Sequence, residues 1–579
     1  MLLFNRDRHH ASINQNYFRK QKVVSNVKKK NDILEYIFLI AILVFVNIIL
    51  SEHFFRLDFT QDKRYSISPV SQQVLGKLDG DVYVEIFLDG DLNPDYERLK
   101  KSIKEKLDQF KAYSNNKLEY RFINPADEAD EQMRERGFRL IAQRGIKPKY
   151  FLEEKNGQKT EKLIFPGAIV SYRQNETPVQ FLKGNKVQSD EEQLNQAVEG
   201  VEFELLKAIR KLSISEYKTI AIIDGHGEPA KEQLEDVTST LNEFYSVQRI
   251  RLDSITALKH FDMAMVIGPK VAYSEKEKFI LDQFINNGGK AMFIYDAIDI
   301  RKDSLKNGET FGLSKNLNLD DLLFKYGIRM NQSVVEDMNC AKTVVQTGLN
   351  GEVQALNFPY YPVIYQFNKH PIVKNMDAVV LRFAGSIDTV KAVGIKKTPL
   401  IQTSAQSKEV QVPFQIDLDV LKKDLDPASF NGGIKTVACL LEGSFTSLYK
   451  SKPAPVEYAV VVSGAKPSKV LVCADLDMIR NDYDVNRNMP VPLGYDRDMR
   501  YLFSNKEFIL NAVDYMMEEE LLLVREKEVV MRPLNEQKIK NDKKYWQIVN
   551  IVSPIILVLI YGISRYLWRK KKYGTPRNV

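Results

Sequence analysis

Near the middle of the chain, residues 218–229 read KTIAIIDGHGEP, and this stretch decides how the surrounding sequence is interpreted. Its uninterrupted apolar run predicts a buried β-strand. Gly225 and Gly227 predict a tight turn, and Pro229 suits the first position of a helix. A strand, a glycine turn and a helix in this order open an α/β sheet. We therefore expect the turn to lie at the carboxyl end of a parallel strand, where such sheets bind ligands.

The sequence downstream continues this alternation. It contains a helix with Leu234, Val237, Leu241 and Phe244, then VQRIRL (247–252), MAMVIGP (263–269), a helix from Ser274, and GGKAMFIYDA (288–297). Strands and helices at this spacing predict a doubly wound parallel sheet over residues 216–307. Residues 308–530 are predicted to be mixed α/β, and they either complete this sheet or stand alone. Residues 531–544 are a charged linker.

The glycine turn carries three side chains that could bind a ligand or transfer protons, Asp224, His226 and Glu228. Backbone donors at such a turn can hold an anion, and His226 with Asp224 suits acid–base work. A dinucleotide-binding fingerprint is half met, because both glycines fit but Ala230 takes the third place. The alternative is a strand-to-helix turn that needs glycine only for its dihedral angles. The sequence leaves open a ligand turn, an interdomain turn and a purely structural turn.

Upstream, residues 52–215 predict a first α/β domain. VYVEIFLDG (82–90) is a strand, Leu99, Ile103, Leu107 and Phe110 recur at helical spacing, and LEYRFINP (118–125) is a second strand. This is a right-handed βαβ unit. Residues 150–152, 164–172 and 179–182 predict an antiparallel addition, and residues 189–212 an amphipathic helix. The arrangement is compatible with a thioredoxin-like fold, but the chain has no C-x-x-C, which excludes that redox chemistry.

Two apolar stretches flank this external block. Residues 33–51 read ILEYIFLIAILVFVNIILS, and residues 545–564 read YWQIVNIVSPIILVLIYGIS. A helix of either length crosses about 30 Å of hydrocarbon. Lysines and arginines cluster before the first stretch and after the second, which places both basic ends, 1–32 and 565–579, in the cytoplasm. Residues 52–544 are therefore predicted to lie outside the cytoplasm.

Polar residues within the two spans predict contacts with other membrane helices. They are Asn47, Asn550 and Pro554. Polar groups in hydrocarbon favour helix partners, and neighbouring helices can satisfy backbone groups freed by proline. The formal net charge of +7 comes mostly from the two basic ends. It indicates contact with anionic membrane lipid and not with nucleic acid.

Motifs for catalysis and cofactors are missing from the sequence. There is no G-x-x-x-x-G-K-[ST], no G-x-S-x-G and no H-E-x-x-H, and the six histidines are too scattered to suggest metal-ligand spacing. An amidotransferase-like fold would need a nucleophilic cysteine after a central strand, where this chain has Lys270. The three cysteines allow at most one disulfide, and Cys439 and Cys473 resemble buried strand residues. We expect no enzyme activity, no cofactor and no bound metal.

The chain resembles the GldG family, the membrane-anchored auxiliary components of the gliding-motility ABC transporters of Bacteroidetes-type bacteria. The resemblance rests on the order of RYSISPVS (64–71), IFLDGDLNPDYERLK (86–100), EYRFINP (119–125), AIIDGHGE (221–228), VIGP (266–269), NGG (287–289), LLFKYGI (322–328), LEGSF (441–445) and the helix 505–515. It covers nearly the whole chain, including both spans.

The resemblance implies an inner-membrane protein with its bulk in the periplasm and a degenerate amidotransferase-like middle. It also implies two partners, a multispanning ABC permease and a separate cytoplasmic ATPase, in support of gliding and the linked secretion apparatus. There are two hypotheses for its role. The chain is either a non-catalytic subunit whose external domains transmit or receive the motion of the permease, or a doubly tethered solute-binding module with an unknown solute.

Overall fold

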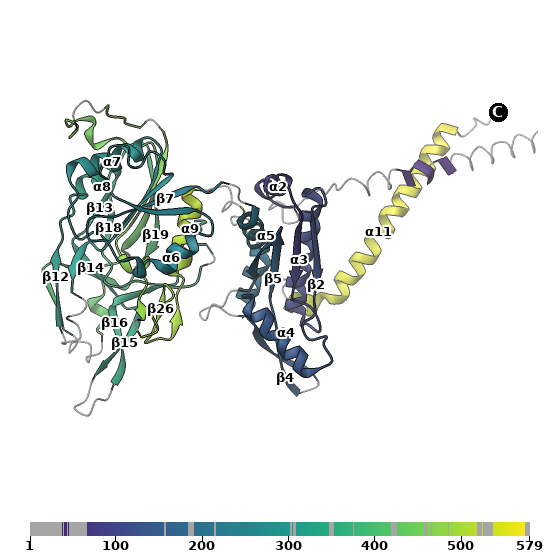
Figure 1. The fold of residues 1–579 in the computed structure, drawn as a ribbon. Helices are drawn as coiled ribbons and strands as arrows, with labels where there is room; N and C mark the ends of the chain where they lie inside the picture. The colour runs from purple at the N-terminus through teal and green to yellow at the C-terminus, as the bar shows by residue number, and fades with distance from the viewer. Residues whose placement is uncertain are drawn as a thin grey trace, which may run out of the picture. The chain divides into compact units, whose positions relative to one another are not determined.

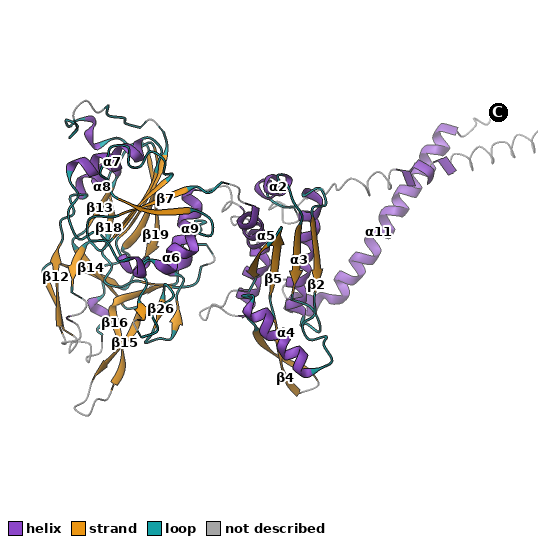
Figure 2. Ribbon diagram, in the orientation of Figure 1, coloured by secondary structure: helices purple, strands orange, loops and turns teal. Residues whose placement is uncertain are grey.

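The computed structural model describes most of the chain between its two ends. The described residues are 37–38, 40–42, 44–45, 66–155, 158–182, 190–213, 216–301, 304, 309–346, 353–374, 376–417, 425–456, 460–464, 466–484, 486–517, 524 and 536–573. The chain divides into two compact units, Met1–Lys527 and Glu528–Val579. The first unit contains mixed α/β structure, which confirms the predicted fold class at that level (Figure 2).

The first α/β domain follows the first predicted span. Its helices are α2 (Pro69–Gly76), α3 (Pro94–Tyr113), α4 (Glu131–Gln143) and α5 (Asp190–Ser213). Its strands are β1 (Val82–Ile86), β2 (Leu118–Phe122), β3 (Lys149–Lys155), β4 (Gln158–Ile164), β5 (Gly167–Tyr172) and β6 (Asn175–Gln180).

Strand β1 lies inside a four-stranded sheet with the order β2-β1-β5-β6 (Figure 1). It runs parallel to β2 and antiparallel to β5, and β6 is antiparallel to β5. Helix α3 supplies the crossover that two parallel strands require. The predicted βαβ unit and its antiparallel addition are therefore present. One expectation is wrong, because residues 150–152 belong to β3, which pairs with β4 in a separate hairpin and not in the sheet.

Helix α3 illustrates why these residues form these elements. The side chain of Asn93 caps the helix by accepting the Tyr96 N–H, and Pro94 occupies the first turn, where its missing N–H costs nothing. The residues at helical spacing, Leu99, Ile103, Leu107 and Phe110, are fully buried against the sheet. The opposite face of α3 is rich in lysine.

A nine-stranded sheet organises the second part of the unit. Its order is β13-β18-β22-β23-β10-β9-β7-β8, and β19 also pairs with β22. Its strands are β7 (Thr219–Ile223), β8 (Ser246–Ile250), β9 (Met263–Ile267), β10 (Lys290–Ile294), β13 (Ile328–Met330), β18 (Ile387–Thr389), β19 (Ile395–Gln402), β22 (Thr436–Gly443) and β23 (Ser468–Cys473).

The strands from β23 to β8 at one end of this sheet are parallel, and antiparallel pairs form the other end. β23, β10, β9, β7 and β8 all run in one direction. β22 is antiparallel to β23, and β18 and β19 are each antiparallel to β22. Residues 216–307 and 308–530 therefore contribute strands to one sheet.

Helices cover both faces of the parallel strands (Figure 1). On one face, helices α6 (Glu235–Leu241) and α9 (Asn505–Met517) pack against strand residues such as Ile220 and Met292. On the other face, α7 (Glu275–Asn286) and α8 (Asp320–Tyr326) pack against residues such as Ala221 and Phe293. Because successive strand residues point to opposite faces, the parallel strands are apolar throughout and lie between two cores.

Smaller sheets and turns surround this core. The sheets are β11 (Ile298–Ile300) with β12 (Glu309–Ser314) and β21 (Phe414–Asp417); β14 (Ser333–Asp337) with β20 (Ser407–Gln411); β15 (Cys340–Gln346) with β16 (Val353–Ile364) and β17 (Val379–Val380); β24 (Tyr483–Asp484) with β25 (Met489–Pro490); and β26 (Tyr495–Asp496) with β27 (Tyr501–Leu502). The 3-10 turns are η1 (Lys231–Gln233), η4 (Pro427–Ser429), η5 (Leu448–Lys450) and η6 (Leu476–Met478).

The second unit holds one long helix, α11 (Glu536–Tyr573). Its segment Gln547–Lys571 is long and apolar enough to cross a membrane. Pro554 lies inside this helix, and Asn550 is exposed on it. Of the first predicted span, 33–51, only residues 37–38, 40–42 and 44–45 are described, and they are helical. The span as a whole and Asn47 lie outside the described residues.

Candidate functional site

The glycine turn lies where ligand sites of α/β sheets form. Strand β7 has β8 on one side and β9 on the other, so the chain leaves β7 in one direction and returns on its opposite side. This reversal is a topological switch point, and a crevice forms there outside the carboxyl ends of the strands. Asp224–Glu228 follows β7 directly, and Pro269 and Lys270 follow β9. The sequence-predicted residues therefore lie at the expected edge.

The carboxylate of Glu228 occupies the backbone donors of this turn. Its side chain is fully buried, and its Oε2 accepts the N–H of Gly225 at 2.9 Å and the N–H of His226 at 2.7 Å. Gly225 and Gly227 have φ angles of +121° and +79°, which glycine adopts without strain. Two backbone N–H groups that would suit an external anion are thus bound to the chain's own carboxylate.

His226 lies between two carboxylates and against an aromatic ring. Its Nδ1 is 3.3 Å from Oε1 of Glu228, and its Nε2 is 3.2 Å from Oε1 of Glu277 on α7. The Tyr273 ring stacks on the imidazole with a centroid separation of 3.8 Å and an angle of 14°. Burial raises the pKa of Tyr273 well above its usual value, and the negative charges of Glu228 and Glu277 raise it further. The tyrosine therefore stays neutral beside the carboxylates.

Glu277 reaches His226 because the start of α7 fixes its position. Ser274 and Glu277 form a capping box, in which Oε2 of Glu277 accepts the Ser274 N–H at 2.9 Å and the hydroxyl at 2.6 Å. Burial raises the pKa of Glu277, but the hydrogen bonds from Ser274 and the contact with His226 lower it by more. The pKa of this carboxyl therefore lies below its usual value, and the group is a carboxylate at neutral pH.

The crevice between β7 and β9 is closed by main-chain bonds. The carbonyl of His226 accepts the N–H of Lys270 at 2.7 Å and the N–H of Val271 at 2.9 Å. Gly268 has a φ of +54°, and a Cβ atom there would lie 2.6 Å from Cδ1 of Leu476. The loops after β7 and β9 are therefore in close contact at this edge.

Asp224 has a different partner from the one the sequence suggests. Its Oδ1 lies 3.3 Å from Nη2 of Arg249 on β8, and the same nitrogen donates to the Pro229 carbonyl at 2.8 Å. The carboxylates beside His226 are those of Glu228 and Glu277. Sequence reasoning did not place Glu277, Tyr273 or the backbone of Lys270 beside His226. These residues follow a different strand, in the loop after β9 and the first turn of α7.

The chemistry available to this edge is limited. Across the described part of the chain, no group of three or more histidine, cysteine, aspartate or glutamate side chains is arranged to hold a metal ion. All three cysteines are free thiols, and Cys439 and Cys473 are buried. Burial raises the pKa of Cys340 to about 11 and of Cys439 to about 12, and it raises that of Cys473 well above the usual value of a thiol. Since the thiolate is the nucleophile, these thiols are inert at neutral pH.

These features define a mixed α/β protein with one candidate membrane helix in its described residues. Residues 217–512 match a family model described as an ABC-type uncharacterized transport system. The match covers just over half of the chain, and the chain belongs to this family of transport-system auxiliary components. Residues 61–171 match a second model, a domain of unknown function (DUF7088).

A curated relative aligns along almost the whole chain. It is a protein from Borreliella burgdorferi, described as uncharacterized, that is 22% identical over 563 residues, which is 94% of this chain and 99% of the relative. Among solved structures, the chain is similar to the mmIFT52 N-terminal domain (TM-score 0.31, 11% identity, 52% of this chain and 98% of that chain). It is also similar to a ThuA-like protein from Parabacteroides merdae (TM-score 0.27, 9% identity, 55% and 94%). At TM-scores this low, neither structure bears on the function of this chain.

Proposed function

We propose that this chain is a non-catalytic, membrane-anchored subunit of an ABC transporter complex. Its partners are a multispanning permease and a separate cytoplasmic ATPase, and residues 52–544 lie in the periplasm of a bacterial inner membrane. The family of transport-system auxiliary components supports the transporter role. The ordered motifs shared with the gliding-motility auxiliaries support a role in gliding and its linked secretion apparatus.

The main support for this proposal is the closed crevice at the carboxyl ends of strands β7 and β9. An α/β enzyme or receptor of this architecture would leave its switch-point donors available to a substrate. Here the Gly225 and His226 amides bind Glu228, and the Lys270 amide binds the His226 carbonyl. The edge contributes to stability by these internal bonds. A structural subunit, unlike a receptor, does not need free donors at this edge.

The domain types and the membrane anchors belong to the same proposal. The sheet order β2-β1-β5-β6 supports a thioredoxin-like first domain, and the strands β7–β10 with helices on both faces support a degenerate amidotransferase-like second domain. Helix α11 supports one of the two proposed spans. The basic residues beyond the outer ends of the two apolar stretches support two cytoplasmic termini. Tethering at both ends suits a subunit that follows the motion of a permease better than a shuttling receptor.

The test is purification of the full-length chain at native expression in a mild detergent, followed by mass spectrometry. We expect a permease and a Walker-A ATPase to copurify in stoichiometric yield. Recovery of the chain alone, under conditions that keep other membrane complexes intact, would contradict the proposal and favour the solute-binding module.

A variant pair locates the contact with the permease. Asn550→Leu removes a polar group from the exposed surface of α11, whereas Val552→Leu keeps an apolar residue on the same helix. Because polar groups in hydrocarbon favour helix partners, we expect N550L to lower the yield of the permease and V552L to leave it unchanged. Equal yields for the two variants would exclude a packing role for Asn550.

A further inference from the structure

Strand β2 forms one edge of the four-stranded sheet of the first domain. Within the described residues β2 pairs only with β1, on one side. The N–H of Val82 donates to the Lys117 carbonyl, and the N–H of Ile123 donates to the Ile86 carbonyl. In a parallel ladder these bonds determine which residues of β2 direct their N–H and C=O groups toward β1 and which direct them outward. The backbone groups of Glu119 and Arg121 therefore face β1, and those of Tyr120 and Phe122 face outward.

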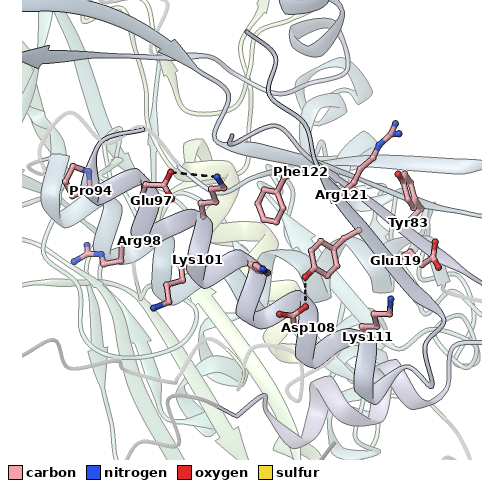
Figure 3. A pocket seen from close by; sticks show the side chains of 13 residues that line it. Tyr83, Pro94, Glu97, Arg98, Lys101, Asp108, Lys111, Glu119, Arg121 and Phe122 are labelled. Carbon is pink, nitrogen blue, oxygen red and sulfur yellow. Dashed lines mark hydrogen bonds and ion pairs between the residues drawn. The ribbon is translucent and has the colours of Figure 1, made fainter. Parts of the chain in front are cut away.

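A groove of about 1100 Å³ runs along this edge (Figure 3). One wall is the lysine-rich face of α3, and the other is formed by β2 with Tyr83 of β1. Phe122 lies between the helix and the strands in Figure 3. The lining holds six basic side chains and three acidic ones, Arg98, Lys100, Lys101, Lys104, Lys111 and Arg121 against Glu97, Asp108 and Glu119. The groove is therefore basic with an aromatic base.

Three of these cations have no partner within the described chain. Lys101, Lys104 and Lys111 make no ion pair or side-chain hydrogen bond there, whereas Lys100 pairs with Asp89 at 2.7 Å. The acidic Asp108 on the same helical face accepts the Tyr120 hydroxyl. Lys101 and Lys104 are exposed, and Lys111 is half-buried. The groove thus presents positive charge that the domain itself does not neutralise.

The spacing of these groups matches an extended peptide. From Lys101 to Lys111 the helix rises by about 15 Å, at 1.5 Å per residue. A strand of about five residues covers a similar length, at 3.3 Å per residue. Strand β2 itself has five residues. A segment lying beside β2 would carry alternate side chains toward α3, where acidic groups would meet the lysines.

We propose that this groove binds an acidic, extended segment of a partner protein, which adds to the sheet as a strand beside β2. Main-chain hydrogen bonds to Tyr120 and Phe122 supply register, and Lys101, Lys104 and Lys111 select acidic side chains. A lipid headgroup lacks the alternating N–H and C=O groups that a strand presents at its repeat, so it does not pair with the outward edge of β2. A peptide backbone supplies both groups in that order. The groove is a feature of the first domain alone and does not depend on the transporter role.

The binding experiment uses the full-length chain in phosphatidylcholine nanodiscs. The probe is a decapeptide of alternating Glu and Thr with an acetylated N-terminus and a fluorophore on its C-terminal amide. Its binding is followed by fluorescence anisotropy. A decapeptide that alternates Lys and Thr is the control. We expect saturable binding of the acidic peptide only, weakened by added salt, and protection of residues 118–122 in hydrogen exchange. Binding of neither peptide, or of both equally, overturns the proposal.

A charge-reversed variant tests the lysines. K101E/K104E/K111E changes the three unpartnered cations, and K391E/K450E/K466E changes three exposed lysines of the second domain. We expect the first variant to bind the acidic peptide at least about tenfold more weakly, and the second to bind as the wild type does. Equal affinities for the two variants place the peptide elsewhere and overturn the proposal.

A pair of substitutions at one position tests the strand pairing. Tyr120→Pro and Tyr120→Val both remove the ring, but only Y120P removes the outward N–H. Because that N–H does not bond β1, proline there spares the ladder, as edge strands allow. We expect Y120P to bind about tenfold more weakly than Y120V. If the two bind equally, the peptide does not pair with β2.

A final arm distinguishes protein from lipid. Vesicles of phosphatidylglycerol are mixed with the nanodisc-held chain and floated. Flotation that K101E/K104E/K111E abolishes, together with absence of peptide binding, would assign the groove to anionic lipid and reject the peptide.

Discussion

The carboxyl edge of the nine-stranded sheet and the free edge of β2 are both places where α/β domains meet other molecules, but their polar groups are in opposite states. At the first edge, two amides of the glycine turn bind Glu228, and two amides after β9 bind the His226 carbonyl. At the second, the outward backbone of β2 and three lysines of α3 have no partner in the described chain. The position of an edge in the fold therefore does not by itself show whether it binds another molecule. The informative observation is whether its hydrogen-bond donors and acceptors already bond to groups of the same chain.

The largest expected effect comes from opening the closed edge. Glu228→Ala leaves the Gly225 and His226 amides without their acceptor, which should lower the free energy of unfolding by about 3 kcal/mol. Glu228→Gln keeps one acceptor oxygen and should cost about half as much. Urea unfolding of the full-length chain in detergent, with hydrogen exchange of β7–β10, measures both. Wild-type stability of E228A would mean that the carboxylate does not hold the turn.

Filling the narrowest point of the same edge should have a smaller effect. Gly268→Ala adds a Cβ that meets Leu476 and strains a positive φ, which we expect to cost about 2 kcal/mol. Leu476→Ala removes the clashing atoms, so the double variant should lose less than the sum of the two single losses. The same unfolding measurement tests this. Simple additivity would show that the two residues do not compete for the space.

Acid should weaken the closed edge through Glu277. Because its pKa is lower in the folded chain than in the unfolded chain, its stabilising contribution is present above the unfolded pKa of about 4.3 and is lost as the pH falls through the folded pKa. Between about pH 5 and pH 3, the wild type should lose more stability than Glu277→Gln. Glu235→Gln, an exposed substitution on α6, should follow the wild type. Parallel pH profiles for all three proteins would exclude this role.

The open groove should show almost no effect on stability. K101E/K104E/K111E alters side chains without partners in the described chain, so the free energy of unfolding should change by no more than about 0.5 kcal/mol. The same unfolding measurement applies. A loss as large as that of E228A would show that these lysines stabilise the fold, and the contrast between the two edges would disappear.

The order of elements around β7 is predictable from the sequence because its signals are local. The apolar run ending at Ile223, the two glycines and Pro229 indicate strand, turn and helix within a dozen residues. The partners of His226 are not local. Tyr273 and Glu277 reach it only because β9 lies beside β7, and strand order cannot be read from one sequence. The one local signal was Ser274 with Glu277, the pattern of a capping box, and it marks a helix start and not a site.

The groove escapes sequence reasoning for a related reason. Lys101, Lys104 and Lys111 have the spacing of an ordinary solvated helix face, and Leu118–Phe122 has the pattern of any half-buried strand. Only the sheet order shows that β2 is an edge strand and that α3 lines it. The antiparallel addition shows the same limit, because the pattern of residues 150–152 predicts a strand but not which strand it pairs with.

Helix α11 has a mechanical consequence. It is a continuous helix of 38 residues, about 57 Å long, which is nearly twice the thickness of a hydrocarbon core of about 30 Å. If its apolar segment is held in a bilayer, a tilt of about 10° about that segment's centre moves Glu536 sideways by about 6 Å. Pro554 interrupts the hydrogen-bond ladder and is where the helix bends most easily. The helix can thus convert a small rotation inside the membrane into a displacement several ångströms wide outside it.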